Sequence, residues 1–396
     1  MKKILFVVLV SLLGALAGCT PEKPPRGAVT LAFTNDARGG LADCGCANQP
    51  LGGLARRIGY LKKLRAANAD RTLLVESGDF LYPEEPAPWG EPEKAAARAE
   101  TIANAYRIAG YDAVLFGQRD YALGVAPLKK LAEKMAVPIL GANVLDKQTG
   151  KHFWRESLIV QRGGLRIGLI GVIGLPREPA TVWRSEVEVV SPIDVTRRVV
   201  AELRPQVDLI VLAANLDAAL LKELLGQVPG IDFVLRSNDA GKITHRVEIM
   251  HDVPTACLFA GGQYVGRFDI TFVEPKKLFQ DLSERDILQR KIDQYQAYVT
   301  AMEKEAGGSN RVAQFFQGQT ERLENYRKYR LGIADWKKEL AKIKEKGNRY
   351  AYEMAELNDA VAPDPLVAAQ VEYFVRTGQF GPVAAGDPEP VIKSKQ

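Results

Sequence analysis

Histidine and cysteine are scarce in this chain of 396 residues, which contains three histidines and four cysteines. His152, His245 and His251 lie away from the polar motifs described below, which favours a surface or packing role for each over catalysis. An excess of charge of one sign is also missing, because the net charge is +5 and falls by two to +3 without Lys2 and Lys3. This balance gives no reason to expect nucleic acid as a partner.

Long apolar runs are absent except at the N-terminus. Lys2 and Lys3 precede an apolar run that ends before Leu16-Ala17-Gly18-Cys19, which is the pattern of a secretory signal peptide over residues 1–18. The apolar stretch is shorter than the roughly 20 residues that a membrane-spanning helix needs. The cysteine resembles that of a bacterial lipobox, which implies acylation of Cys19 and attachment to a membrane through the lipid.

Residues 19–28 form a proline-rich tether after the predicted cleavage site. Thr20 occupies a position where an inner-membrane retention signal often has aspartate. We therefore expect a protein of the cell envelope, lipid-anchored at the outer membrane on its periplasmic or surface side rather than at the inner membrane.

The next 250 residues alternate between strand and helix patterns. Strands are predicted at 29–34, 71–76, 112–116, 137–140, 165–172, 209–213 and 233–235, and helices at 54–67 and 95–109. Such alternation predicts a layered α/β fold with polar residues gathered at strand ends. Asp36 and Asp79 each follow a predicted strand.

The C-terminal third has a different pattern. Apolar residues three and four positions apart, interrupted at Gly307–Asn310, predict an α-helical hairpin within residues 276–346. Its charged faces could be solvated or could bind a partner protein. Residues 347–380 are predicted to pack back on the body, and residues 381–396 to form a disordered tail.

Eight motifs occur in the order found in the bacterial 5′-nucleotidase/UDP-sugar hydrolase family of calcineurin-like metallophosphatases, which the chain resembles. They are Phe33–Asp36, Gly52–Arg57, Ser77–Phe80, Gly110–Gly117, Ala142–Val144, Val207–Leu212, Pro229–Asp232 and Gly262–Gly266. The resemblance implies a four-layer sandwich of two sheets flanked by helices over residues 29–275. It does not extend to the family's separate C-terminal substrate-binding domain.

The resemblance also identifies the positions of a two-metal site, and most of its histidines are replaced. The corresponding residues are Asp36, Arg38, Asp79, Gln118, Arg119, Asp120, Asn215 and Asn238. Two metal ions about 3.5–4 Å apart need several anionic or imidazole ligands. Asp36 and Asp79, even with Gln118 and Asn215, are too few for such a pair, so no cofactor is expected.

Three arginines replace lost ligands or lie next to them, namely Arg38, Arg119 and Arg236. They could serve only to neutralise Asp36 and Asp79, which would otherwise be unpaired charges. Alternatively, their guanidinium groups could bind phosphate, sulfate or a nucleotide phosphate as well.

Cys44 and Cys46 are separated by one glycine in a loop close to Asp36. A disulfide between them would be strained and easily reduced, which suggests a redox role. A structural loop disulfide, a link from one of them to Cys257 and a pair of free thiols are the alternatives. The Cys-Gly-Cys segment before Gly52–Arg57 also resembles a subgroup of the family that has this motif.

Two functions follow from these observations. The first is a lipid-anchored member of the family that has lost dinuclear hydrolysis and binds an anion or a partner, or uses Cys44 and Cys46 in redox chemistry. The alternative is a divergent, active phosphoesterase for nucleotides or related esters. It would hold one divalent ion (Mn, Zn, Ca or Mg) with Asp36, Asp79, Gln118 and Asn215.

Overall fold

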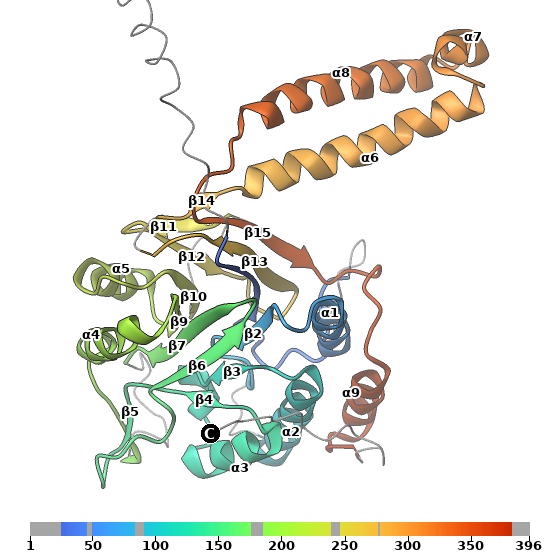
Figure 1. Cartoon of the computed structure of the whole chain (residues 1–396). Coiled ribbons are helices and arrows are strands. Elements are labelled where there is room, and N and C mark those ends of the chain that lie inside the picture. The colour runs from blue at the N-terminus through green and yellow to red at the C-terminus, as the bar shows by residue number, and fades with distance from the viewer. Residues whose placement is uncertain are drawn as a thin grey trace, which may run out of the picture.

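The computed structural model describes residues 25–45, 50–83, 91–175, 185–238, 246–275 and 278–381. Within these ranges two β-sheets form the body, helices flank them, and two long helices project from one end (Figure 1). The predicted signal peptide, Cys19 and the tail after residue 381 lie outside the described residues, as does Cys46. Among the described helices, none combines the length and apolarity needed to cross a bilayer.

The first sheet has the strand order β14-β15-β13-β1-β2-β3-β4 among the described residues. Its strands are β1 (Gly27–Thr34), β2 (Thr72–Glu76), β3 (Ala113–Leu115), β4 (Ile139–Leu140), β13 (Tyr264–Phe272), β14 (Gln280–Asp281) and β15 (Arg349–Glu356). β1 to β4 are parallel to one another, whereas β13 is antiparallel to both β1 and β15. Strands from both ends of the sequence therefore meet in this sheet.

The second sheet has the order β11-β12-β10-β9-β7-β6. Its strands are β6 (Ser157–Arg162), β7 (Leu165–Ile173), β9 (Leu209–Asn215), β10 (Phe233–Ser237), β11 (Glu248–Met250) and β12 (Val253–Cys257). β5 (Val144–Asp146) and β8 (Val187–Val189) form a separate antiparallel pair. Every residue of β9 is buried, as expected for a parallel strand covered on both faces.

Helices complete the four layers. α1 (Leu54–Ala67), α2 (Pro92–Ala109), α3 (Val125–Met135) and α9 (Pro365–Thr377) lie on the side of the first sheet, and α4 (Pro192–Leu203) and α5 (Ala218–Gln227) on the side of the second (Figure 1). Alternate side chains of β7 show the layering. Ile167 and Leu169 belong to the main core, which contains residues of both sheets, while Ile170 and Val172 pack in a second core with residues of α4 and α5. The predicted four-layer α/β fold is confirmed.

The C-terminal hairpin consists of α6 (Ser283–Glu305) and α8 (Thr320–Lys342), joined through the short helix α7 (Val312–Phe315). It has a small apolar core of its own, which includes Ile292, Val299 and Ile333. The predicted C-terminal helical hairpin is therefore confirmed. The segment predicted only to pack on the body contributes β15 to the first sheet and α9 to its outer layer.

Candidate functional site

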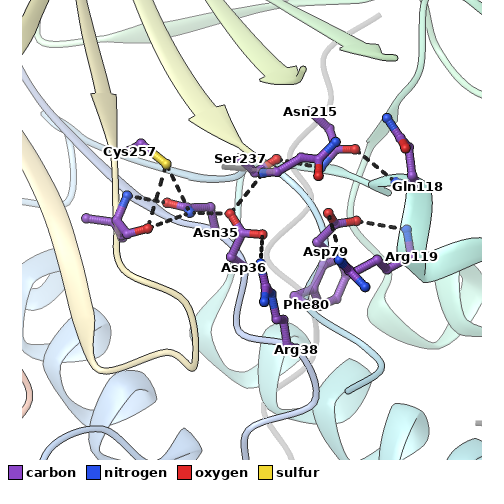
Figure 2. A network of polar contacts seen from close by, with 12 residues as sticks. Asn35, Asp36, Arg38, Asp79, Phe80, Gln118, Arg119, Asn215, Ser237 and Cys257 are labelled. Atoms are coloured by element: carbon purple, nitrogen blue, oxygen red, sulfur yellow. Dashed lines mark hydrogen bonds and ion pairs between the residues drawn. The ribbon is translucent and has the colours of Figure 1, made fainter. Parts of the chain in front are cut away.

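Residues at the ends of strands from both sheets gather at one place in the molecule (Figure 2). Asp36 follows β1 and Asp79 follows β2, whereas Asn215 and Ser237 end β9 and β10 of the other sheet. Gln118 and Arg119 come from the turn after β3. The sequence-predicted residues Asp36, Asp79, Gln118, Arg119 and Asn215 are thus brought together, although they are up to 179 positions apart in the sequence.

Asp36 is 1% exposed and has a positive φ of 48°. Its Oδ2 accepts hydrogen bonds from Asn35 Nδ2 at 2.8 Å and from the backbone N–H of Asn238 at 3.0 Å. Its Oδ1 is buried without a hydrogen-bond partner among the described residues, and it lies 3.7 Å from Arg38 Nη2. One carboxylate oxygen therefore ties the loop after β1 to the end of β10, while the other faces a guanidinium beyond hydrogen-bond distance.

Asp79 repeats this arrangement in the neighbouring loop. It is fully buried, has a φ of 61°, and accepts the backbone N–H of Arg119 on Oδ1 at 2.9 Å. Its Oδ2 is also buried without a hydrogen-bond partner in the described part of the chain, and it lies 3.9 Å from Arg119 Nε. Each aspartate thus keeps one oxygen without a hydrogen bond and has an arginine within 4 Å of that oxygen.

Asn215 links the two sheets through its side-chain amide. Its Oδ1 accepts the backbone N–H of Gln118 at 3.0 Å, and its Nδ2 donates to Ser237 Oγ at 2.8 Å. Ser237 Oγ in turn donates to the backbone oxygen of Ser77 at 2.5 Å. Asn215 is therefore held in place by structural hydrogen bonds on both atoms of its amide.

Asp120 has a structural role, although its position in the sequence placed it with the site residues. Its carboxylate accepts the backbone N–H groups of Asp79, Phe80, Leu81 and Gly117 at 2.8 to 3.0 Å. Four donors on one buried carboxylate fix the loop after β2 against the turn after β3. Asp120 positions Asp79 and Arg119.

Burial weakens the acidity of both site aspartates. Burial, and secondarily the charge of Asp79, raises the pKa of Asp36 to about 7. Burial also raises the pKa of Asp79, against the opposing effects of Asn215 and of Arg119. Since Oδ2 of Asp36 accepts two N–H donors, a proton on Asp36 belongs on Oδ1.

The two arginines lie at the outer edge of the site. The side chains of Arg38 and Arg119 are 21% and 32% exposed, whereas those of their aspartates are 2% and 0% exposed. Arg236 instead lies within β10, paired in register with Cys257 of β12, and is buried. The predicted approach of arginines to Asp36 and Asp79 is found for Arg38 and Arg119, and that of Arg236 stays a prediction.

Three residues that lie at the site were not predicted from the sequence to belong to it. Asn35 donates to Asp36, Ser237 orients Asn215, and the buried Cys257 has its Sγ 3.8 Å from Asn35 Nδ2 (Figure 2). Asn35 and Ser237 could have been found because each adjoins a motif residue at a strand end, but no pattern in the sequence pairs Cys257 with Asn35. Cys44 is exposed in its loop, and His245 lies outside the described residues.

Known proteins with similar sequences are nucleotidases, although no family model matches the chain. The chain is 29% identical over 192 residues to a probable 5′-nucleotidase of Treponema pallidum, which covers 47% of the chain and 30% of that protein. It is 26% identical over 211 residues to a 5′-nucleotidase of Vibrio cholerae, which covers 50% of the chain and 36% of that protein. The match spans about a third of the length of these relatives.

Solved structures agree on the fold. A 5′-nucleotidase precursor from Thermus thermophilus aligns with a TM-score of 0.53 at 21% identity, over 64% of the chain and 53% of that protein. A calcineurin-like phosphoesterase from Bacillus subtilis aligns with a TM-score of 0.50 at 18% identity, over 64% of the chain and 89% of that protein. Over about half of its length the chain is similar in sequence to 5′-nucleotidases. Its body has the calcineurin-like phosphoesterase fold.

A dinuclear metal centre of the kind that the resemblance implies does not fit the residues present. The two oxygens without hydrogen bonds, Asp36 Oδ1 and Asp79 Oδ2, could face a cation, but each already has a guanidinium within 4 Å. Of the described histidines, His152 pairs with Glu156 at 3.2 Å and His251 lies in the turn between β11 and β12. In the described ranges no group of three His, Cys, Asp or Glu side chains is placed to bind a metal.

Proposed function

We propose that this chain is an exported, lipid-anchored member of the 5′-nucleotidase-like family that binds an oxyanion without hydrolysing its esters. The anion would be phosphate, sulfate or the phosphate group of a nucleotide. The observation that carries the proposal is the placement of Arg38 and Arg119, each within 4 Å of a buried aspartate at the family's metal positions.

The charge of the cluster supports binding of an anion. The guanidinium groups of Arg38 and Arg119 bring two positive charges, whereas burial raises the pKa of both Asp36 and Asp79. The two carboxyl groups together therefore carry less negative charge than their number suggests, and the cluster is left net positive near neutral pH. A protonated Asp36 Oδ1 beside Arg38 would add a third donor group for an oxyanion.

The same cluster argues against hydrolysis. A phosphoesterase of this fold needs metal ions to generate its nucleophile and to stabilise the transferred phosphoryl group. The amide oxygen of Asn215 and one oxygen of each aspartate already accept N–H donors. The remaining donors cannot surround two ions, so binding is expected without turnover.

One observation favours an active phosphoesterase as a second candidate. Asp36 and Asp79 both keep positive φ angles, a conformation that costs of the order of 1–3 kcal/mol for a non-glycine residue and often occurs at functional sites. The oxygens without hydrogen bonds on these two residues would be the donors for a single divalent ion, with Gln118 and Asn215 nearby. The curated relatives are themselves named as 5′-nucleotidases.

The decisive experiment combines three measurements on the purified chain. Metal content after loading with Mn²⁺, Zn²⁺, Ca²⁺ or Mg²⁺, hydrolysis of AMP, and calorimetric titration with phosphate, sulfate and AMP are compared for the wild type and Arg119→Gln. We expect anion binding without turnover or bound metal, and weaker binding in the variant. One or two bound ions with turnover that Asp79→Asn abolishes would establish the phosphoesterase instead.

The location and the thiol pair complete the proposal. Export is supported by the signal-peptide pattern over residues 1–18. Metabolic labelling with palmitate should mark the chain and should fail for Cys19→Ser.

For Cys44 and Cys46 we propose a reversible thiol–disulfide couple. Mass spectrometry across a series of redox buffers should show a two-hydrogen mass change that Cys44→Ser removes.

A further inference from the structure

The hairpin of α6 and α8 projects from the body (Figure 1). One flank of it carries aromatic side chains that the site does not use. Tyr295, Tyr298, Tyr329 and Trp336 form this flank, with ring centroids 4.6 to 5.7 Å apart in neighbouring pairs. Tyr298 is 54% exposed, whereas Tyr295, Tyr329 and Trp336 are half-buried against the core of the hairpin. Lys291 Nζ lies 5.8 Å from the centroid of the Trp336 ring. We call Lys291, Tyr295, Tyr298, Tyr329 and Trp336 the aromatic flank.

The composition of the aromatic flank is that of residues which sit at a membrane–water interface. Tyrosine and tryptophan join an apolar ring to a polar edge and are enriched at the level of lipid headgroups. Lysine adds attraction to anionic lipids. The hairpin as a whole, residues 283–342, carries 12 Lys and Arg against 9 Asp and Glu. Its net charge of +3 therefore also favours an anionic surface over a basic one.

The topology places the base of the hairpin beside the start of the body. In the first sheet Gly27 pairs with Phe272, Thr271 pairs with Arg349, and Arg349 pairs with Gln280. These pairs lie at one end of β1, β13, β15 and β14, and α6 begins at Ser283, just after β14. The chain thus enters the body at the edge of the sheet from which the hairpin leaves.

The length of the tether sets the distance to the lipid. Arg26, whose backbone N–H donates to Phe272, comes seven residues after Cys19. Seven residues span at most about 25 Å, and the 23 residues of α6 measure about 35 Å. With a lipid on Cys19, the hairpin is therefore longer than the greatest distance between its base and the bilayer.

We propose that the aromatic flank rests on the headgroup layer of the membrane that holds the lipid of Cys19. The occupant of this surface is a bilayer with anionic phospholipids. The flank then acts as a second attachment, which fixes the orientation of the body, and a weak contact suffices because the lipid keeps the flank at high local concentration. This inference builds on the proposed lipid anchor but not on the anion site.

The test uses a chain that begins at Thr20, which lacks the lipid and keeps every described residue. Its co-sedimentation is measured with vesicles of phosphatidylcholine alone and of phosphatidylcholine with phosphatidylglycerol. We expect binding to the anionic vesicles that salt weakens. Lys291→Glu should weaken it at least about fivefold, since one charge near an anionic surface changes affinity by roughly that factor. Tyr298→Ser should weaken it by a similar factor, because it removes the most exposed ring of the flank from the headgroup layer.

Two controls define the surface. Lys337 adjoins Trp336 in the sequence and lies on the other flank of α8, so Lys337→Glu makes the same charge change and should alter binding less than about twofold. Arg119→Gln should leave vesicle binding unchanged, because headgroup phosphate captured by the anion site would otherwise produce the same signal. Circular dichroism verifies that each variant keeps its helices.

Three outcomes would overturn the proposal. One is absence of binding to anionic vesicles, and another is binding that Lys337→Glu weakens as much as Lys291→Glu does. The third is self-association in analytical ultracentrifugation that Tyr298→Ser abolishes while vesicles bind nothing, which would assign the flank to a second copy of the chain. None of these outcomes bears on the anion site, whose test is the titration with phosphate.

Discussion

The Asp36 and Asp79 halves of the site have the same construction but differ in how they are held. Each has a buried aspartate with positive φ after a strand, one oxygen that accepts backbone N–H and one oxygen near an arginine. Arg38 belongs to the same loop as Asp36, whereas Arg119 reaches Asp79 from the turn after another strand. The Asp79–Arg119 pair therefore joins two segments of the fold, while the Asp36–Arg38 pair lies within one loop.

The difference suggests that neutralisation by arginine can be achieved in two ways. A neighbour two positions along the chain needs only a suitable loop, as with Asp36 and Arg38. A partner 40 positions away needs its own support, and Asp120 provides it by holding the two loops together. The first arrangement should tolerate change, whereas the second should fail as a unit.

Removing Asp120 should have the largest effect. Asp120→Ala leaves four buried N–H donors without their acceptor, and we expect a loss of about 4 kcal/mol or more of unfolding free energy. Urea denaturation measures it. Asp217→Ala, which removes an N-cap of α5, is the matched control and should cost about 1 kcal/mol. Equal losses in the two variants would show that Asp120 has no special role.

The pH dependence of the free energy of unfolding should distinguish the Asp36 half of the site from the Asp79 half, and this is the second largest effect. The folded pKa of Asp36 is about 7, above its ordinary value of 3.8, so the folded state holds this proton more tightly than the unfolded chain does. Stability from this group is therefore fully present below pH 4 and is lost as the pH rises through 7, by about 2–4 kcal/mol. Asp36→Asn should remove this slope in denaturation curves between pH 5 and 8. An unchanged slope would contradict the raised pKa.

The sequence predicted the layers of the fold better than the site because apolar patterns record burial directly. The helix at 54–67 agrees with α1 residue for residue, and strands predicted at Val29 and Leu165 are β1 and β7. The place of β15 beside β13 could not be predicted, because the paired residues of the two strands are 78 to 92 positions apart and nothing local encodes the pairing.

The site was partly predicted for a related reason. Asp36 and Asp79 are visible as aspartates that follow strands, and the family resemblance identifies Arg38 and Arg119. The role of Asp120 was hidden, because a carboxylate at that position looks the same whether it faces a ligand or backbone N–H groups. The contact between Cys257 and Asn35 joins strand ends of different sheets, which only the fold brings together.

Anion affinity should respond to both arginines, and more to Arg119. Its side chain is 32% exposed against 21% for Arg38, so it is the more accessible to a ligand. We expect Arg119→Gln to weaken phosphate binding about tenfold or more and Arg38→Gln about fivefold, the range for one lost charge-assisted hydrogen bond. Calorimetry measures the phosphate affinity of both variants. Arg119→Lys should recover only part of the affinity, because an ammonium group lacks the paired N–H donors of a guanidinium group. Undiminished binding in both variants would place the anion elsewhere.

The pH dependence of anion binding should be a smaller effect that reports on the Asp36 half alone. Protonation of Asp36 as the pH falls through 7 removes a negative charge beside Arg38 and adds a donor at Oδ1. Sulfate, which does not itself titrate between pH 6 and 8, should bind a fewfold more tightly at pH 6. Asp36→Asn should abolish this dependence, whereas tighter sulfate binding at pH 8 would reverse the assigned sign.

Cys257→Ser should have the smallest effect and tests how far the Asp36 half extends. Cys257 Sγ lies 3.8 Å from Asn35 Nδ2, the same group that donates to Asp36 at 2.8 Å. A serine hydroxyl accepts hydrogen bonds more strongly than a thiol and would draw this donor away from Asp36, which should raise the pKa of Asp36 slightly. We expect a stability change below about 1 kcal/mol and a small upward shift of the midpoint of the sulfate pH profile. Cys44→Ser should leave that midpoint where it is, because Cys44 lies in an exposed loop and the effect passes only through Asn35.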